Sequence, residues 1–444
     1  MSGRKLQKAL ELVKIIQDRG YSALVAGGAV RDTLLKRRIM DVDLATDMPL
    51  SWLGQEFYGR NIGRSRDFGI MSIEYLGQRY EVSALAGDSR EMENISDRYR
   101  CDAGRRDFTI NSMAMDWTGD ILDPFGGQAD LGNRLIRATL DPDQRFTEDP
   151  LRLLRAVRLA VELDFRVEKQ TGQSMLRLGP LLAQMPGERI GHEVIRMFSQ
   201  SGSQGARAVR LMGRFGLLEI VLPEIQALEG LPHDPEHHPE GGVLKHTLAA
   251  LEAGNSSDPA VNLAILFHDA GKADTLVMQG SSPRYFRHDQ AGIQPVERAC
   301  RRLKLQEGIR QGMEFAAASH MQALAIKEMR PSRVYRFLSH PCWQVLKKVV
   351  LADLAARGGQ EAARFEQHLQ QAQSRVSAWL DKNQKKQPVI SGRQVMELTG
   401  LGQGPLIGRI ISRTTEWAMD NNVQDQKRIR DYVLKLAESG SPKK

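Results

Sequence analysis

Two acidic residues and a pair of glycines near the N-terminus have types and spacing suited to binding a metal and an anion. Asp41 and Asp43 are two positions apart, so in a strand both carboxylates project from one face. Adjacent carboxylates repel each other unless a cation neutralises them, and such oxygen ligands suit Mg²⁺. Gly27 and Gly28 allow the backbone to approach phosphate closely, before a helix predicted over 29–35. The segment predicts a site for a metal and a nucleoside triphosphate; the alternative is a glycine turn followed by a solvated acidic strand end.

Arginines gather in two later segments, and a guanidinium group stays charged and binds phosphate through two parallel hydrogen bonds. The 105–111 segment begins with two arginines beside an aspartate. Further along, Arg152, Arg155 and Arg158 recur every third residue, which keeps them on one side of a helix. Like charges in a row repel each other unless an anion or a carboxylate such as Glu148 meets them. Both segments predict an anion-binding surface, with surface ion pairs and a solvated basic helix face as the alternatives.

Short strands and helices are expected to position these residues. Apolar spacing predicts a helix over 5–19 that ends before Gly20. It also predicts four strands, of which the last two form a hairpin, over 22–26, 41–44, 70–75 and 79–85. Asp149 before Pro150 predicts a helix start, with aspartate as N-cap and proline at the first helical position. Mixed strands and helices are expected to end near residue 140, with helical patterns from there to about residue 421. The predicted fold class is therefore α+β: a mixed sheet with helices, followed by an all-helical body.

Length and composition limit the kind of protein. A chain of 444 residues is too long for one compact core, so two to four domains are expected. A formal net charge of +8 fits a polyanionic partner. The three widely separated cysteines predict neither a disulfide framework nor a cysteine metal site, which fits a cytoplasmic protein. Neither a signal peptide nor a membrane span is predicted, and the sequence leaves the oligomeric state open.

Five ordered segments resemble the motifs of the class II tRNA nucleotidyltransferase and bacterial poly(A) polymerase family: 27–43, 105–111, 123–127, 148–158 and 188–193. The resemblance implies a polymerase-β-like head followed by a helical neck, body and tail. It also implies the reaction, which is addition of nucleotides from CTP or ATP to the 3′ hydroxyl of tRNA without a nucleic-acid template.

The resemblance assigns roles to individual residues. It implies that Asp41 and Asp43 hold two Mg²⁺ ions, one activating the attacking hydroxyl and the other stabilising the triphosphate. It assigns the incoming nucleotide to eight residues: Gly28, Arg31, Arg155 and Arg158 at the triphosphate, Arg106 and Asp107 at phosphate and ribose, and Asp149 and Arg152 at the base. An acceptor beside a forked donor can match the edge of cytosine or adenine, while a mismatched base leaves a buried partner unpaired.

A second group of residues resembles the HD phosphohydrolase pattern. An adjacent histidine–aspartate pair follows an apolar helix, and the expected ligands of a divalent metal are His246, His268, Asp269 and Asp353, with His288 and His320 as candidates for further ligands or phosphate contacts. Family members with such a domain hydrolyse phosphoesters such as 2′,3′-cyclic phosphates, which implies cleaning of damaged tRNA ends. The identity of the metal stays open. The alternatives are polar side chains satisfied within the core and a domain that only binds tRNA.

Two departures from the family leave the nucleotide specificity open. The strand over 81–86 lacks the arginine that full CCA-adding members have, and the loop over 87–104 is somewhat short. Because the family's loop is implicated in the switch from CTP to ATP, an enzyme that adds only CC or only A is an alternative. A poly(A) polymerase is another, although the basic N-terminal extension and long basic tail associated with those enzymes are missing.

The predicted domains are a nucleotidyltransferase head over 1–140, a helical neck over 141–228, an HD-type domain over 229–375 and a helical tail over 376–444. The neck is expected to bind nucleotide and tRNA. Basic residues of the tail could meet the tRNA backbone, although a solvated helix face explains any single one of them.

Overall fold

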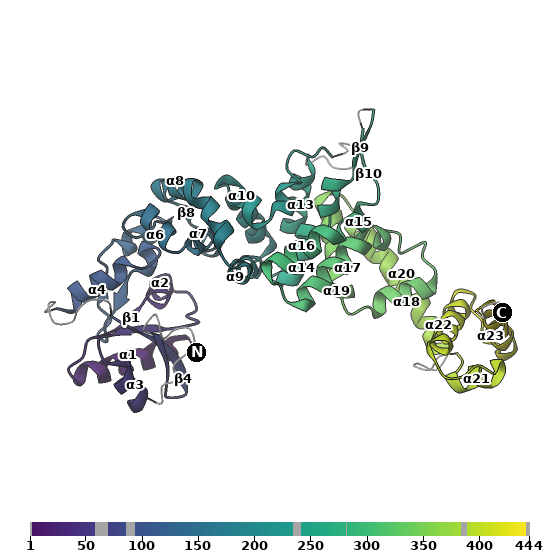
Figure 1. The fold of residues 1–444 in the computed structure, drawn as a ribbon, viewed down its shortest axis with the longest axis horizontal. Helices are drawn as coiled ribbons and strands as arrows, with labels where there is room; N and C mark the ends of the chain where they lie inside the picture. The colour runs from purple at the N-terminus through teal and green to yellow at the C-terminus, as the bar shows by residue number, and fades with distance from the viewer. Residues whose placement is uncertain are drawn as a thin grey trace. The chain divides into compact units, whose positions relative to one another are not determined.

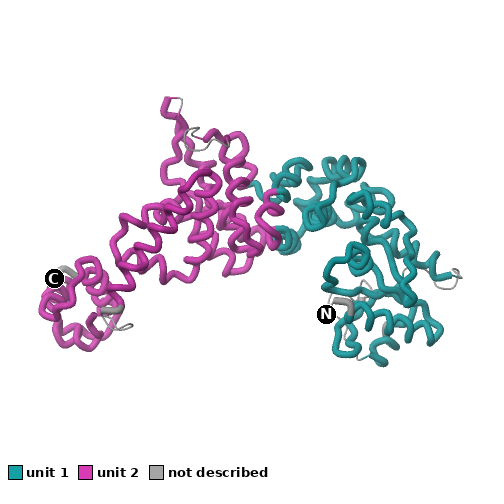
Figure 2. The backbone as a smooth tube through the Cα atoms, turned by 180° about the vertical axis from the view of Figure 1, so that it is seen from behind, with its two compact units in different colours: residues 1–197, 207–223 teal, residues 198–206, 224–444 magenta. Residues whose placement is uncertain are grey.

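The structure is a computed structural model that describes residues 2–57, 70–85, 94–233, 241–280, 282–382 and 389–440. The chain forms two compact units, residues 1–197 with 207–223 and residues 198–206 with 224–444 (Figure 2). The predicted four-part division has boundaries that this grouping does not test, and it stays a prediction. No helix within the described ranges is long and apolar enough to cross a membrane.

A six-stranded mixed sheet forms the head of the first unit (Figure 1). Its order is β3-β4-β2-β1-β5-β6, and β2 and β4 are its parallel pair. The strands are β1 Ala23–Ala26, β2 Asp43–Thr46, β3 Ile70–Tyr75, β4 Gln78–Ala84, β5 Ala114–Met115 and β6 Ile121–Leu122. The head's helices are α1 Ser2–Asp18, α2 Gly28–Leu34, α3 Leu50–Glu56, α4 Ile95–Gly104 and α5 Gly127–Gly132. The predicted first helix and the first four strands are confirmed, with shifts of one or two residues at most ends.

The predicted hairpin closes with a two-residue turn. Tyr75 pairs with Gln78, and both residues between them adopt positive φ, 48° at Leu76 and 69° at Gly77. Two central residues with positive φ match the right-handed twist of the flanking strands. The turn fixes the register of β3 against β4, and the separate parallel pairing of β2 with β4 places Glu81 opposite Asp43.

Helices dominate the rest of the first unit, but strands do not end at residue 140 as predicted. β7 Leu135–Ile136 and β8 Arg166–Val167 form a small parallel sheet, and the second unit holds a hairpin of β9 Leu276–Gln279 and β10 Ser282–Tyr285. These strands are too short to show the alternation that sequence reasoning requires. The helices between residues 142 and 226 are, in chain order, α6 Pro142–Glu148, α7 Leu151–Glu162, α8 Lys169–Leu178, α9 Gly187–Phe198, α10 Gly202–Arg214, α11 Leu218–Val221 and α12 Pro223–Gln226.

The second unit surrounds a buried apolar helix. Every residue of α14 (Pro259–Phe267) from Val261 to its end is buried, and α14 packs against α13 (Val243–Ala253), α17 (Glu307–Leu324) and α19 (Trp343–Ala356). The remaining helices of this body are α15 His288–Ala291, α16 Ile293–Leu303, α18 Pro331–Ser339 and α20 Glu361–Lys382. At the C-terminal end, α21 Gly392–Thr399, α22 Pro405–Asp420 and α23 Gln426–Gly440 share a hydrophobic cluster of their own.

Candidate active sites

The acidic pair lies at the start of β2, but not as predicted. Asp43 is the first residue of the strand, whereas Asp41 precedes it and has a side chain that is 92% exposed. The predicted alternation along one strand is therefore wrong at Asp41, because pairing with β1 begins only at Asp43. Lys5 of α1 lies 3.4 Å from the Asp41 carboxylate.

Sequence reasoning missed a third carboxylate. Glu81 is the partner of Asp43 in the parallel register of β2 and β4, a pairing that no local pattern reveals. Burial raises the pKa of Asp43, the charges of Glu81 and Asp41 raise it further, and Arg106 opposes them. Burial and two neighbouring carboxylates therefore disfavour the charged form of Asp43. The donor set fits a divalent cation, which would relieve this repulsion.

The glycine pair brings backbone close to this carboxylate. Gly27 has a φ of 79°, and a Cβ there would lie 2.8 Å from Arg106 Nη1, so the position requires glycine. Gly28 is the first residue of α2, one turn before Arg31. Arg31 is held in place because it donates to Asn111 Oδ1 at 2.7 Å and to both carboxylate oxygens of Asp32.

A cavity of about 410 Å³ collects the predicted nucleotide residues in the first unit. It is lined by Asp43 and all eight of them, Gly28, Arg31, Arg106, Asp107, Asp149, Arg152, Arg155 and Arg158, while Asp41 is not among its lining residues. Gly27, which the sequence also predicts to approach phosphate, lines the cavity as well, and the lining residues to which sequence reasoning assigned no such role are Asn111, Leu159, Glu162 and Arg196. Gly27 and Asn111 stand inside recognised motifs, but the remaining three reach the cavity only through tertiary packing.

A buried carboxylate connects α7 to the head. Asp107 is 6% exposed, and Arg155 lies 2.7 Å from its Oδ2. Burial alone would raise the pKa of Asp107, but the charge of Arg155 and hydrogen bonds from Asn111 and the Phe108 backbone lower it. The carboxylate is therefore charged and held rigidly at the cavity wall.

The two residues predicted to read the base make ion pairs within the protein. Asp149 Oδ2 lies 3.1 Å from Arg189 of α9. Arg152 lies 3.1 Å from Glu148, the carboxylate that the sequence predicted as a partner of the arginine row. The predicted helix start is displaced by one residue, since α7 begins at Leu151 after Pro150. Asp149 Oδ1 still accepts a hydrogen bond from the Leu151 N–H at 3.3 Å. Both side chains reach the cavity with a polar end already oriented.

Arg158 differs from its neighbours because it is buried. Its side chain is 5% exposed and lies 2.7 Å from Glu193 of α9 and 3.0 Å from Glu162. These carboxylates raise the pKa of Arg158 despite burial, which favours the neutral form. The predicted basic row is thus paired with carboxylates along its length, and its last member joins α7 to α9.

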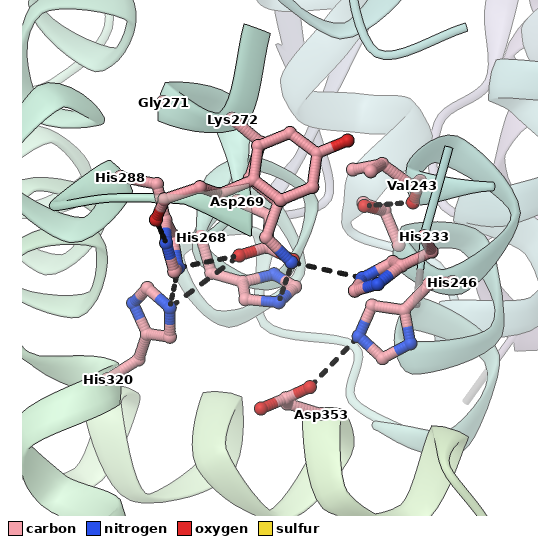
Figure 3. Close-up of polar contacts among 12 residues, drawn as sticks. His233, Val243, His246, His268, Asp269, Gly271, Lys272, His288, His320 and Asp353 are labelled. Carbon is pink, nitrogen blue, oxygen red and sulfur yellow. Dashed lines mark hydrogen bonds and ion pairs between the residues drawn. The ribbon is translucent and has the colours of Figure 1, made fainter. Parts of the chain in front are cut away.

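A second cluster of ionisable side chains lies inside the body (Figure 3). It brings together all six residues predicted for the HD site: His246 of α13, His268 and Asp269 after α14, His288 of α15, His320 of α17 and Asp353 of α19. Less than one-tenth of the surface of each of these residues is exposed. Four helices separated by as many as 107 positions thereby converge on one point.

The ligand atoms of this cluster form two groups that fit metal ions. His246, His268 and Asp353 form one group, and Asp269, His288 and His320 form the other, with ligand atoms within 4.8 Å of one another in each. The Nε2 atoms of His288 and His320 face each other at 3.3 Å, and each lies within 3.6 Å of Asp269 Oδ1.

One histidine nitrogen in this cluster lacks a hydrogen bond. His268 Nε2 is buried and makes none with the described residues, and its distance to Asp269 Oδ2 is 3.4 Å. A buried imidazole nitrogen without a hydrogen bond is an available metal ligand. The donor chemistry therefore fits a divalent transition metal or Mg²⁺.

Two basic residues complete the cluster and were not predicted. Lys272 Nζ lies 2.7 Å from Asp269 Oδ2 and 3.0 Å from His233 Nε2. Although burial opposes ionisation, the charges of His268 and Lys272 hold the pKa of Asp269 well below its ordinary value. Lys272 stands three residues after Asp269 in the sequence, so local spacing is a signal that could have identified it.

Two family models match the N-terminal half of the chain. The poly A polymerase head domain matches residues 23–137, and the probable RNA and SrmB-binding site of polymerase A matches residues 164–228. The multifunctional CCA protein of Halorhodospira halophila is 33% identical over 76% of this chain and 84% of its own length. That of Shewanella denitrificans is 32% identical over 77% and 86%.

A solved structure shares the fold over nearly the whole chain. The Bacillus stearothermophilus CCA-adding enzyme, crystallised in complex with CTP, has a TM-score of 0.71 at 24% identity and covers 98% of both chains. The predicted α+β class, with a polymerase-β-like head and a helical body, is confirmed.

Proposed function

We propose, because this chain belongs to the class II family of CCA-adding nucleotidyltransferases, that it completes the 3′ end of tRNA with C and A taken from CTP and ATP. The observation that carries the proposal is the single cavity shared by Asp43 and the eight nucleotide residues. The relatives named multifunctional CCA protein favour tRNA over general RNA as the acceptor.

In the proposed transfer, the acidic residues bind metal and the arginines bind phosphate. Two divalent metal ions held by Asp41 and Asp43 would activate the attacking hydroxyl and neutralise charge on the triphosphate. Gly28 and Arg31 would meet the phosphates, and their position in the same cavity lining as Asp43 supports this role. Arg155 and Asp107 hold each other in place at the cavity wall, where phosphate and ribose would lie.

Base selection would proceed by exchange of hydrogen bonds. Asp149 and Arg152 are paired with Arg189 and Glu148, so a nucleotide base must replace or share these contacts. A base with the matching donor and acceptor edge compensates for the exchange, whereas a mismatched base leaves one charged group unpaired. Discrimination thus arises from side chains alone, without a template strand.

The number and order of added nucleotides are tested directly with three tRNA ends. The full-length protein receives tRNA that ends before CCA, after C or after CC, with labelled CTP alone, ATP alone or both. We expect CC from CTP alone, A on the CC-ended tRNA from ATP alone, and CCA from the mixture. Incorporation into no tRNA would contradict the proposal, and long A tracts on unrelated RNA would identify a poly(A) polymerase.

Enzymes that add only CC or only A are separate outcomes of this experiment. They would be read from the sequences of the product ends. The loop expected to decide between them spans 87–104, of which residues 87–93 lie outside the described residues. The test includes both alternatives because the strand over 81–86 lacks the arginine that full CCA-adding members have.

A second activity is proposed for the body, and the paired metal-ligand groups support it. A metal-dependent phosphohydrolase would use the two groups of histidines and aspartates to bind phosphoester oxygens and activate water. Asp353 is oriented for this role because His246 and Arg357 both contact its carboxylate, at 2.9 Å and 2.7 Å. The substrate class proposed is a 2′,3′-cyclic phosphate at an RNA end.

Hydrolysis is measured with 2′,3′-cyclic AMP in the presence of Mg²⁺, Mn²⁺, Co²⁺ or Ni²⁺ in turn. We expect turnover with at least one metal, and loss of turnover in His268→Ala. His368→Ala is the matched control, since this histidine lies on α20 and is not part of the cluster. If none of the four metals supports hydrolysis, or if the two variants are equally active, the cluster is structural.

A further inference from the structure

One arginine of the nucleotide cavity has no assigned role. Arg196 of α9 lines the cavity with Leu159 and Glu162 and has an exposed side chain. The cavity is lined by six arginines and four acidic residues. An arginine on such a wall whose charge is not taken up by a carboxylate suits a polyanion such as a triphosphate.

The other five arginines are each neutralised by a carboxylate. The pairs are Arg31 with Asp32, Arg106 with Asp102, Arg152 with Glu148, Arg155 with Asp107, and Arg158 with Glu193 and Glu162. Among the residues that the structure describes, no carboxylate pairs with Arg196. It is therefore the lining arginine whose charge and donors are available without breaking an ion pair.

The spacing of contacts along α9 shows where Arg196 lies. Arg189 meets Asp149, and Glu193, one turn later, meets Arg158. Arg196 follows Glu193 by three residues, which places it on the same side of the helix. It lies seven residues beyond Arg189, or about 10 Å along the helix axis at 1.5 Å per residue. Arg196 therefore lines the cavity about two helical turns away from the contact of Arg189 with Asp149, the residue proposed to read the base.

We propose that Arg196 binds the outer phosphates of the incoming nucleotide and the pyrophosphate that leaves, without regard to the base. The proposal rests on the proposed transferase function of the same cavity. A guanidinium group can donate two parallel hydrogen bonds to phosphate and remains charged at all working pH values. It follows that its contribution is equal for CTP and ATP, in contrast to that of Arg152.

The test compares Arg196→Ala with Arg166→Ala in the full-length protein. Arg166 is also an exposed arginine of the first unit, but it does not line the cavity, so the change in net charge is matched. We expect Arg196→Ala to raise the KM for CTP and for ATP by similar factors of about 10-fold to 100-fold. Arg196→Lys should recover part of this loss, because it keeps the charge but not the forked geometry.

Binding without turnover provides the second readout. Calorimetric titration with magnesium pyrophosphate and with CMP should show weaker pyrophosphate binding in Arg196→Ala and unchanged CMP binding. Unchanged affinity for pyrophosphate and unchanged KM for both nucleotides would contradict the proposal, as would a rise confined to the KM for tRNA. A wild-type protein that incorporates no nucleotide would instead contradict the transferase function, and pyrophosphate titration would still test Arg196.

Discussion

The two candidate sites differ in how exposed they are and in which charged groups surround them. In the head, the Asp41 side chain is 92% exposed and stands beside a cavity lined by six arginines. In the body, the His246 side chain is 0% exposed and that of Asp353 is 3% exposed. The head site is therefore exposed and rich in arginines, whereas the body site is closed and rich in neutral or anionic metal ligands.

This difference shows how each site is completed. In the head, neighbouring carboxylates crowd Asp43, and Arg196 is the lining arginine that no carboxylate of the described residues meets, so a metal and a nucleotide would each find a charge that the protein leaves unbalanced. The body has ligand atoms that already converge within hydrogen-bonding distance of one another. We expect the substrate to organise the first site and the folded protein to organise the second.

The largest expected effect tests whether the two sites are separate. Asp41→Asn removes one charge beside β2, and we expect a loss of nucleotide incorporation of about 10³-fold or more, with hydrolysis of 2′,3′-cyclic AMP retained. His268→Ala should have the reverse effect. Both activities are measured on the same preparations. Loss of both activities in either variant, with an unchanged circular dichroism spectrum, would show that the sites depend on each other.

The next effect concerns stability, and it follows from the burial of the body site. Removal of bound metal by EDTA should lower the melting temperature of the body by about 5–10 °C, because a ligand at 100 times its Kd contributes about 2.7 kcal/mol. Differential scanning calorimetry measures the change. In His268→Ala the EDTA effect should disappear, while in Asp41→Asn it should persist. A melting temperature that does not respond to EDTA would contradict a metal in the cluster.

Base selection should show a smaller effect that is confined to the head. Arg152→Ala removes a forked donor that is proposed to read the base, so the preference between CTP and ATP should decrease by about 10-fold to 100-fold. The ratio of kcat/KM for the two nucleotides on CC-ended tRNA is the measurement. Glu148→Gln controls for loss of the internal ion pair, because it leaves Arg152 in place. An unchanged ratio in Arg152→Ala would place base selection elsewhere.

The smallest effect is a pH dependence of stability in the head. The pKa of Asp107 lies below the ordinary 3.8, so its ion pair stabilises the protein fully above that pH and loses this contribution as the pH falls toward the folded value. Asp107→Asn should therefore be less stable than wild type by about 1–3 kcal/mol at pH 7. Urea unfolding should show that the difference shrinks below about pH 4. A difference that is constant with pH would contradict the assignment.

The sequence predicted both sites mainly where the evidence is local. Leu24–Ala26 and its glycine turn, the 70–85 hairpin and the basic row of α7 all follow from neighbouring residues. Glu81 was missed because its role depends on a parallel pairing with β2, and Arg196 because it depends on how α9 packs beside α7. Asp41 was placed on a strand because alternation does not reveal where pairing begins.

The histidine cluster could be predicted in its members but not in its arrangement. Its six members were identified by resemblance, although their side chains come from segments spread over more than a hundred residues. Lys272 stands three residues after Asp269, a spacing that could have identified it, and its contacts with Asp269 and His233 show that it belongs to the group. Residue type suggested the metal site, whereas its division into two ligand groups required the structure.

The buried pair of Arg158 and Glu193 has a consequence for how this protein can change over generations. Loss of Arg158 leaves the carboxylates of Glu193 and Glu162 without their shared cation, at a cost of about 3–5 kcal/mol, which is a large part of a typical domain's stability. Loss of Glu193 is milder, because Arg158 keeps its ion pair with Glu162. A change at position 158 should therefore be followed by changes at both carboxylate positions, whereas a change at position 193, which lies 35 residues away, can occur alone.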